Sequence, residues 1–440
     1  MVKLTGTFSK LQKVKTLVIG DFMLDRYTYG IINRISPEAP VSILKVKNEK
    51  MQLGGAGNVV LNLLSLGAEV TAIGRIGDDI YGDILVKLLK DKNCKNNNLF
   101  IQKDYQTPVK NRFLAENQQI LRVDFEKEEI LSNDLENEII EKLPHLIKSQ
   151  KVIAISDYAK GFLSNRLIRF VIDIAKENKI PVIVDPKGID FIKYKSANIL
   201  KPNLKEAYGA ANLNLEVSLS IVAKKLIEKT KVDNLLITRS SDGISLFSKK
   251  IKRQDFPVKS KDVKDVTGAG DTVLAMLCIA IANGLDLSLA SQLANIAASI
   301  AIEHIGCAQI TLADFAKRLL KYDTENKIFD FSHLFALKKV LENKKFSLLA
   351  VNSSKGMTTP ILRAIKKIST SYKDTIIYIL DEKPDDEFVD LLSSINEVSF
   401  IILHNKLKNL CSEINPESVY IMKKDQAYPL KNSKELIKLC

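Results

Sequence analysis

The segment Asp265–Asp271 combines small residues and two glycines, and it ends in a carboxylate just before a continuous apolar run that extends to Ala280. This pattern predicts a tight turn that leads into the N-terminus of a buried helix. Such an end presents unpaired backbone N–H groups and the positive end of the helix dipole. Gly268 and Gly270 would let an anion approach that backbone closely.

A carboxylate at the same place would repel the anion. Its presence is explained if Asp271 takes a proton from a hydroxyl group that attacks a phosphoryl group held by the N–H groups. On the local sequence alone, an ordinary N-cap aspartate after a glycine turn is an equally good interpretation. The segment therefore predicts either a helix cap or a site of phosphoryl transfer.

Polar residues follow most of the buried strands that the hydrophobic pattern predicts. Strands that alternate with helices, such as those predicted at 164–178 and 219–229, indicate a parallel sheet with helices on both faces. Ligands bind such sheets at the carboxyl ends of the strands. The polar residues just after predicted strand ends, or at the turn described above, are Asp21, Asp157, Asp185, Asn203, Arg239 and Asp271.

Two further stretches lie between the first strand and the first long helix. The segment 33–40 contains two prolines and cannot be helical, and residues 41–47 read as a strand, so we expect a small β flap over a site. The glycine-rich stretch 54–58 lacks the spacing of a dinucleotide-binding fingerprint. It is either a simple tight turn or a place where a polyol lies against backbone and Asn58 binds its hydroxyl groups.

Composition narrows the range of partners. The formal net charge of +13 is spread along the chain without blocks of like charge, which suits small anionic substrates and gives no sign of nucleic-acid binding. The five cysteines have no CxxC spacing, which argues against zinc or a disulfide framework and for a reducing cytoplasm. No signal peptide is evident, and the longest apolar run is too short for a membrane span. We therefore expect a cytoplasmic protein without membrane or nucleic-acid partners.

Taken together, the motifs resemble the ribokinase-like (PfkB) carbohydrate kinases. The stretches 54–58 and 265–271 are similar to the two signatures of that family. Strings that resemble its D-glycero-β-D-manno-heptose 7-phosphate kinases are found at 21–27, 34–41, 117–124, 156–161 and 185–188. The resemblance extends over about residues 10–320 and implies a ribokinase-like doubly wound α/β sheet with a small β flap, which we assign to residues 1–322.

The resemblance also implies roles for individual residues. Asp271 would be the general base, and Gly268, Ala269 and Gly270 would form the anion hole. ATP would be bound by Asn203, Leu204, Lys205, Glu206, Thr238, Arg239 and Gly243, with Glu206 organising Mg²⁺ through water. The sugar substrate would be bound by Asp21, Arg34, Gly54, Gly55, Asn58, Arg122, Asp185 and Lys187, of which Arg34, Arg122 and Lys187 are candidates for its existing phosphate.

Residues 323–440 resemble the nucleotidyltransferase domain that follows the kinase in bifunctional members, and we expect a smaller Rossmann-like α/β domain there. An active domain of that kind has His-x-Gly-His at its first helix, whereas this chain has Phe335 and Ala336 in place of the last two residues. We expect a degenerate domain without transferase activity, kept for stability or for dimer contacts.

The implied activity is the ATP- and Mg²⁺-dependent phosphorylation of D-glycero-D-manno-heptose 7-phosphate at its anomeric carbon. The product, heptose 1,7-bisphosphate, would serve the synthesis of ADP-heptose and of the lipopolysaccharide core, and the enzyme would be a homodimer. Three alternatives stay open: a kinase of another sugar or sugar phosphate, a bifunctional kinase and adenylyltransferase, and a non-catalytic sugar-phosphate sensor. The intact Gly268–Asp271 segment disfavours the sensor, which has no need of a base.

Overall fold

The computed structural model describes most of the chain as two compact units. The described residues are 10–94, 96–116, 118–127, 129–249, 253–258, 263–304, 306–325, 327–329, 337, 341, 344–354, 356–372, 374–381, 384–403, 407–423 and 425–430. The larger unit spans Leu11–Phe315, and the smaller unit contains Met1–Lys10 and Ala316–Cys440. Each unit is described by itself below.

The larger unit is built on a nine-stranded sheet with the order β13-β12-β11-β10-β9-β8-β1-β4-β5. Its strands are β1 (Lys15–Gly20), β4 (Glu69–Gly77), β5 (Asn96–Gln102), β8 (Val152–Ser156), β9 (Val182–Asp185), β10 (Ile199–Leu200), β11 (Asn234–Thr238), β12 (Ile244–Ser248) and β13 (Gln254–Phe256). Strands β11 to β5 are parallel, and β12 and β13 add antiparallel pairs at one edge. Central strands such as β8 are buried at every position, as expected for parallel strands covered on both faces.

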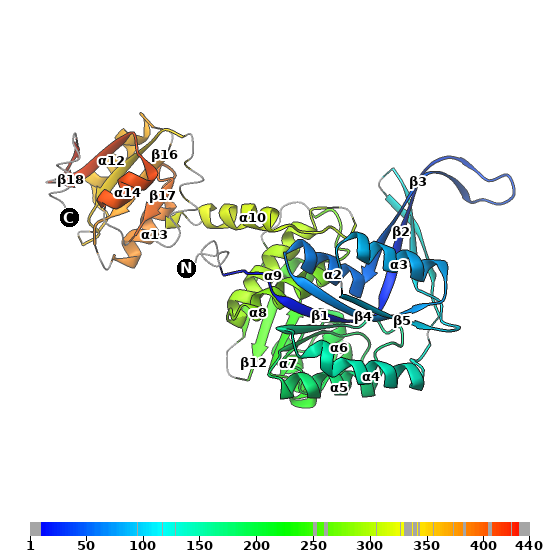
Figure 1. The fold of residues 1–440 in the computed structure, drawn as a ribbon. Helices are drawn as coiled ribbons and strands as arrows, with labels where there is room; N and C mark the ends of the chain where they lie inside the picture. Colours follow the sequence, from blue (N-terminus) through cyan, green and yellow to red (C-terminus); the bar gives the residue numbers. More distant parts are fainter. Residues whose placement is uncertain are drawn as a thin grey trace. The chain divides into compact units, whose positions relative to one another are not determined.

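Helices cover both faces of this sheet, which confirms the predicted doubly wound α/β fold (Figure 1). Helices α4, α5, α6 and α7 share one apolar core with the strands, and α2, α8 and α9 lie on the other face. The helices of this unit are α2 (Ala56–Ser65), α3 (Ile80–Asp91), α4 (Asn133–Ile147), α5 (Asn165–Glu177), α6 (Leu204–Ala211), α7 (Leu219–Thr230), α8 (Ala269–Ala282) and α9 (Leu287–Ala301), and α10 (Leu312–Glu325) crosses into the smaller unit.

The predicted flap is a separate four-stranded sheet with the order β3-β2-β6-β7. Its strands are β2 (Phe22–Ile35), β3 (Ser42–Gly55), β6 (Val109–Ala115) and β7 (Gln118–Phe125). The sequence predicted a strand only at 41–47 and a turn at the glycines. In the structure β3 continues to Gly55, because it pairs with β2 as far as Phe22, and Gly55 at φ 56° then opens α2 directly. The glycine stretch is therefore a strand-to-helix junction and not a turn.

The smaller unit has a six-stranded sheet with the order β14-β17-β16-β15-β18-β19, parallel except at β19. Alternate residues of β15 and β16 enter two different apolar clusters, so both faces of the sheet are buried. Its elements are β14 (Ile328–Phe329), β15 (Phe346–Val351), α12 (Thr359–Ser369), β16 (Asp374–Ile379), α13 (Asp386–Ser394), β17 (Phe400–Ile402), α14 (Leu407–Ile414), β18 (Ser418–Lys423) and β19 (Gln426–Pro429). The predicted α/β architecture of this stretch is confirmed. The string at 333–336, on which the expected loss of transferase activity rests, lies outside the described residues.

No helix in the described part of the chain is long and apolar enough to cross a membrane.

The close pairing of β1 with β8 gives a test of the fold. A Cβ atom at Gly20 would lie 2.2 Å from the carbonyl oxygen of Ser156 in the neighbouring strand. We expect Gly20→Ala to lower the free energy of unfolding by about 1–3 kcal/mol, because the sheet must shift to accommodate the methyl group. Gly209→Ala in α6 is the matched control, since its Cβ would meet nothing closer than 3.4 Å. Denaturant unfolding that gave both variants the same stability would contradict the described strand packing.

Candidate active site

The carboxyl ends of the central strands bring several predicted residues to one edge of the sheet. Gly20 is paired with Ser156, and Ser156 is paired with Asp185, so Asp21, Asp157 and Asp185 stand at the ends of three adjacent strands. In open α/β sheets ligands bind at the carboxyl edge where the strand order reverses, which here is between β1 and β8. The sequence predicted this gathering from the strand ends alone.

Asp271 lies in the first turn of α8, close to this edge. The helix begins after Gly268, which has φ 78°, and the side chain of Asp271 is buried, with the residue 4% exposed. Its Oδ2 accepts a hydrogen bond of 2.7 Å from Asn58 Nδ2, and its Oδ1 accepts one of 2.8 Å from the Tyr158 hydroxyl. Burial raises the pKa of Asp271, and the hydrogen bonds from Asn58 and Tyr158 and the charge of Lys201 oppose that rise. The carboxylate is thus held in place by two donors from different elements.

The N-terminus of α8 is open to an anion and faces a buried cation. Gly268 cannot carry a side chain without conflict, because a Cβ there would lie 2.8 Å from Asn58 Nδ2. A Cβ on Gly270 would lie 3.5 Å from Lys201 Nζ, so the lysine ammonium points at this helix end. Lys201 is only 2% exposed and forms an ion pair of 2.9 Å with Asp185. A helix N-terminus with a buried lysine beside it is well suited to a negatively charged phosphoryl group.

Two further carboxylates of this edge have strongly raised pKa values. Burial raises the pKa of Asp185 to about 7, with Lys201 opposing and the nearby Asp271 adding to the rise. Burial raises the pKa of Asp21 to about 6, and the neighbouring charge of Asp157 adds to the effect. Buried acids this close together repel one another, and such perturbed pKa values in a cleft are typical of functional sites.

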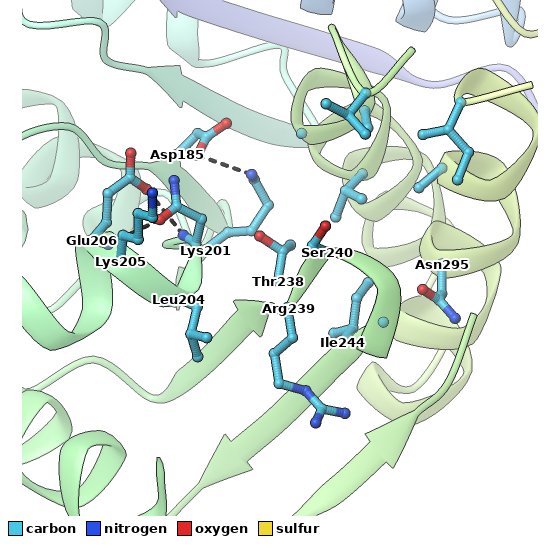
Figure 2. Close-up of a pocket in the computed structure, with 18 of the residues that line it drawn as sticks. Asp185, Lys201, Leu204, Lys205, Glu206, Thr238, Arg239, Ser240, Ile244 and Asn295 are labelled. Carbon is cyan, nitrogen blue, oxygen red and sulfur yellow. Dashed lines mark hydrogen bonds and ion pairs between the residues drawn. The ribbon is translucent and has the colours of Figure 1, made fainter. Parts of the chain in front are cut away.

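A cavity of about 750 Å³ extends from this helix end along the strand ends (Figure 2). It is lined by all of the residues that the sequence assigned to ATP, namely Asn203, Leu204, Lys205, Glu206, Thr238, Arg239 and Gly243. Ala269, Gly270, Asp185 and Lys187 line it as well. Ile244, Val273 and Ile302 supply apolar walls. The cavity therefore combines an apolar part with the anion-accepting end of α8, which suits a nucleotide.

Glu206 is the predicted magnesium residue, and its local structure is well defined. Asn203 and Glu206 form a capping box at the start of α6, with hydrogen bonds of 2.9 Å and 3.0 Å between side chain and backbone. The second contact of Glu206 is an ion pair of 2.8 Å with Lys187 Nζ. Among the residues that the structure describes, no group of three or more His, Cys, Asp or Glu side chains is arranged to hold a metal ion. Both oxygens of Glu206 are therefore engaged, Oε2 by the backbone N–H of Asn203 and Oε1 by Lys187 Nζ.

Three of the predicted sugar residues, Asp21, Gly54 and Gly55, lie outside the lining of that cavity, where the flap joins the sheet. The Oδ2 atom of Asp21 accepts hydrogen bonds from the backbone N–H groups of Tyr158 (2.8 Å) and Lys160 (3.2 Å). Its Oδ1 atom is buried and has no partner within the described residues, so it is available to a ligand hydroxyl group. A Cβ at Gly54 would lie 2.6 Å from Asp25 Oδ2, and one at Gly55 would lie 2.5 Å from the Asp21 carbonyl oxygen. Both glycines are therefore required where the flap approaches the sheet edge.

Two candidates for the substrate phosphate are not brought to the cavity. Arg34 is exposed near the end of β2, on the flap. Arg122 lies on β7 and pairs with Asp124 through contacts of 2.9 Å and 3.0 Å. The third candidate, Lys187, lines the cavity together with Glu206, on the side of the predicted ATP residues. The structure thus spreads these three residues over two regions of the unit.

The residues that sequence reasoning missed are Tyr158 and Lys201. Both stand next to predicted residues, Tyr158 after Asp157 and Lys201 two residues before Asn203, yet neither a tyrosine nor a lysine at such places carries a signal of its own. Asp157, which was predicted only as a strand-end residue, accepts hydrogen bonds of 2.6 Å from Lys193 Nζ and from the Tyr194 hydroxyl. The Oδ2 atom of Asp157 is therefore engaged by other side chains of the protein.

The chain resembles several known proteins over most of its length. A model of the pfkB family carbohydrate kinases matches residues 14–314. The bifunctional protein HldE of Campylobacter jejuni subsp. doylei is 45% identical over 340 residues, which are 77% of this chain and 71% of that protein. The bifunctional protein HldE of Trichlorobacter lovleyi is 42% identical over 325 residues, which are 73% of this chain and 66% of that protein.

Solved structures show the same fold at low identity. The phosphofructokinase-2 of Escherichia coli in complex with substrates and products has a TM-score of 0.60 and 20% identity, and the match covers 71% of this chain and 100% of that chain. The ribokinase of Arabidopsis thaliana, complexed with ribose and ATP, has a TM-score of 0.55 and 20% identity, with 70% and 99% covered.

The hydrogen bond from Tyr158 to Asp271 gives a prediction about pH dependence. The hydroxyl group stabilises the charged carboxylate, so Tyr158→Phe should raise the pKa of Asp271 further. We expect the acid limb of the pH–rate profile for phosphoryl transfer to move upward by about one pH unit, with activity regained at high pH. Tyr208→Phe, which removes a hydroxyl contact to the Val217 carbonyl, is the control and should leave the limb in place. A loss of rate in the Tyr158 variant that is equal at every pH would contradict this role.

Proposed function

This chain belongs to the pfkB family of carbohydrate kinases, and on that premise we propose that it transfers the γ-phosphoryl group of ATP to the anomeric hydroxyl group of D-glycero-D-manno-heptose 7-phosphate. The observation that carries the proposal is the position of Asp271. It lies in the first turn of α8, directly after Ala269 and Gly270, which line the cavity, and it accepts a hydrogen bond from Asn58, a residue proposed for the sugar. The product, heptose 1,7-bisphosphate, would serve ADP-heptose and lipopolysaccharide core synthesis.

The chemistry follows from this placement. Asp271 takes the proton of the anomeric hydroxyl, whose oxygen then forms a bond to the γ-phosphorus while the bond to the ADP oxygen breaks. The anion hole that we assign to Gly268, Ala269 and Gly270, together with the nearby ammonium of Lys201, would stabilise the negative charge that gathers on the transferred group. Asn58 and Tyr158 keep the carboxylate aimed and charged. The protein thus contributes mainly positioning and charge neutralisation.

The nucleotide would lie in the 750 Å³ cavity with its phosphates at the end of α8. Asn203, Thr238 and Gly243 line the wall along which it would extend, and Arg239 is at the same wall. The Glu206 carboxylate fits Mg²⁺, because it is an oxygen ligand that lines the same cavity as the start of α8, and it would hold the ion through water. When bound, Mg²⁺ neutralises charge on the nucleotide phosphates.

The choice of substrate rests on the flap side of the site. Asp21 has a free buried oxygen for a sugar hydroxyl, and the strings at 34–41 and 117–124 resemble heptose 7-phosphate kinases rather than kinases of ribose or nucleosides. The relatives named bifunctional protein HldE support the same substrate for this chain. A homodimer through the flap is part of the proposal, by analogy with the family.

For residues 323–440 we propose that no nucleotidyl transfer takes place. The support is the sequence, which has Phe335 and Ala336 where an active domain needs glycine and histidine. The well-packed sheet of this unit fits a structural role, either in stability or in contacts between subunits.

The kinase proposal is tested by ADP release. We expect turnover on D-glycero-D-manno-heptose 7-phosphate and little or none on ribose, because only the former suits the flap side. Asp271→Asn should lower kcat by about 100-fold or more, because the base is lost while the shape is retained. Turnover on ribose but not on the heptose phosphate would show that the proposed substrate is wrong. If no sugar caused ADP release although the protein still bound nucleotide, a non-catalytic sensor would be favoured.

The second proposal is tested on the full chain. Incubated with ATP, Mg²⁺ and D-glycero-D-manno-heptose 1-phosphate, the Asp271→Asn variant should release no pyrophosphate, because no second transferase site is formed. The variant removes any background from the kinase site. Release of pyrophosphate together with ADP-heptose would show that residues 323–440 are active after all.

A further inference from the structure

One face of the flap carries charged side chains in a regular pattern. The register of β2, β6 and β7 places Asp25, Lys110 and Asp124 in one row across the sheet. The next row on the same face contains Tyr27, Arg112 and Arg122. Residues two positions apart on a strand share a face, so three cations and two acids meet there. The face is directed toward the site, because Asp25 Oδ2 contacts Cys307 Sγ at 3.7 Å and lies against Gly54.

The two acids of this face are already paired with the two arginines. Arg112 Nη1 donates to Asp25 Oδ1, and both groups are almost fully buried. Arg122 holds both oxygens of Asp124 at 2.9 Å and 3.0 Å. Within the described residues this leaves Lys110 without an acid at ion-pair distance, although it is flanked by both acids in the register. On β2, β6 and β7 these two rows therefore carry one positive charge more than negative charges.

Lys110 is also close to the reacting groups. Its Nζ atom lies 5.3 Å from the centre of the Tyr158 ring, and the hydroxyl of that tyrosine donates to Asp271. A single aromatic side chain therefore separates the unpaired ammonium from the carboxylate that would act as base. Burial lowers the pKa of Lys110, and the nearby Lys160 and Arg122 lower it too, while Asp25 and Asp124 oppose them. A half-buried ammonium among other cations is stabilised by an incoming anion.

We propose that Lys110 binds the existing phosphate of the sugar substrate, at the far side of Tyr158 from the anomeric hydroxyl group. The proposal rests on the proposed function, because it assigns the phosphate subsite of the same reaction. It names a residue outside the three earlier candidates. Lys160 and Arg122 are the neighbouring cations, and each already has a partner, Glu126 at 2.6 Å and Asp124. Lys110 is the cation of this group with no acid of its own in the described structure.

The other candidates fit this role less well. Lys187 lies on the nucleotide side of Asp271 and is paired with Glu206, so a sugar phosphate there would compete with the nucleotide. Arg34 is exposed on the flap. Lys110 lies on the flap side, with Asp21 and Gly54, where the sugar is expected. The length of a sugar phosphate, with its reacting hydroxyl at one end and its phosphate at the other, matches a base and a cation separated by one side chain.

The test compares heptose 7-phosphate with the unphosphorylated heptose. Lys110→Met should raise KM for the 7-phosphate by about 10-fold to 100-fold, because a charge-assisted contact is lost. The change in kcat/KM for the unphosphorylated heptose should be several-fold smaller than the change for the 7-phosphate, and Lys110→Arg should retain part of the preference for the phosphate. Lys87→Met, which removes the same charge from an exposed position on α3, is the control and should behave as the wild type. Equal losses on both sugars, or no loss on either, would overturn the proposal.

A second measurement separates this proposal from the choice of sugar. Pyridoxal 5′-phosphate forms imines with lysines in phosphate sites and can be fixed by reduction and mapped by mass spectrometry. We expect Lys110 to be labelled in the wild type and protected by heptose 7-phosphate. Inorganic phosphate alone should protect it only weakly, because it lacks the sugar contacts. If the wild type turns over no heptose phosphate yet Lys110 is still protected by other sugar phosphates, the substrate assignment fails and the subsite stands. Absence of labelling and of protection would reject the subsite.

Discussion

The site depends on keeping the carboxylate of Asp271 charged, although another acid and a proposed phosphate site lie next to it. Asp271 is buried next to Asp185 and at the end of a helix that is suited to phosphate. Burial and neighbouring acids both favour its neutral form, which cannot act as a base. Asn58, Tyr158 and Lys201 counter this effect from three different elements. The positions of α2, of the segment after β8 and of the segment after β10 are therefore all constrained by the need to keep Asp271 charged.

Much of the fold could be predicted from the sequence because parallel sheets leave a clear pattern. Buried strands read as short apolar runs, and the polar residue after each run marks the edge where ligands bind. This reasoning identified Asp21, Asp185 and Asp271 and the helix that begins at the glycines. The predicted nucleotide residues line one cavity because 203–206 follow β10, and 238–243 begin at the last residue of the adjacent strand β11.

The sequence could not reveal which side chains meet across elements. Tyr158 reaches Asp271 across more than a hundred residues of chain, and Lys201 faces Gly270 only because their elements end at the same edge. The extent of β3 was also missed, because glycines normally end a strand, whereas here the close approach of Asp25 and of the Asp21 carbonyl makes them necessary within it. The side-chain pairs across the flap also depend on the register between its strands, which the sequence of one strand alone does not reveal.

Two of the four connections between the flap and the rest of the larger unit have almost no linker. Only Asp21 separates β1 of the main sheet from β2 of the flap, and β3 passes into α2 with no residue between them. A tilt of the flap must therefore twist the backbone at Asp21 and shift the start of the helix that carries Asn58. The residues at these connections are the same ones that are proposed to contact the substrate and the base. At these two connections the orientation of the flap is therefore coupled directly to the alignment of the reacting groups, because no loop lies between them to absorb a tilt.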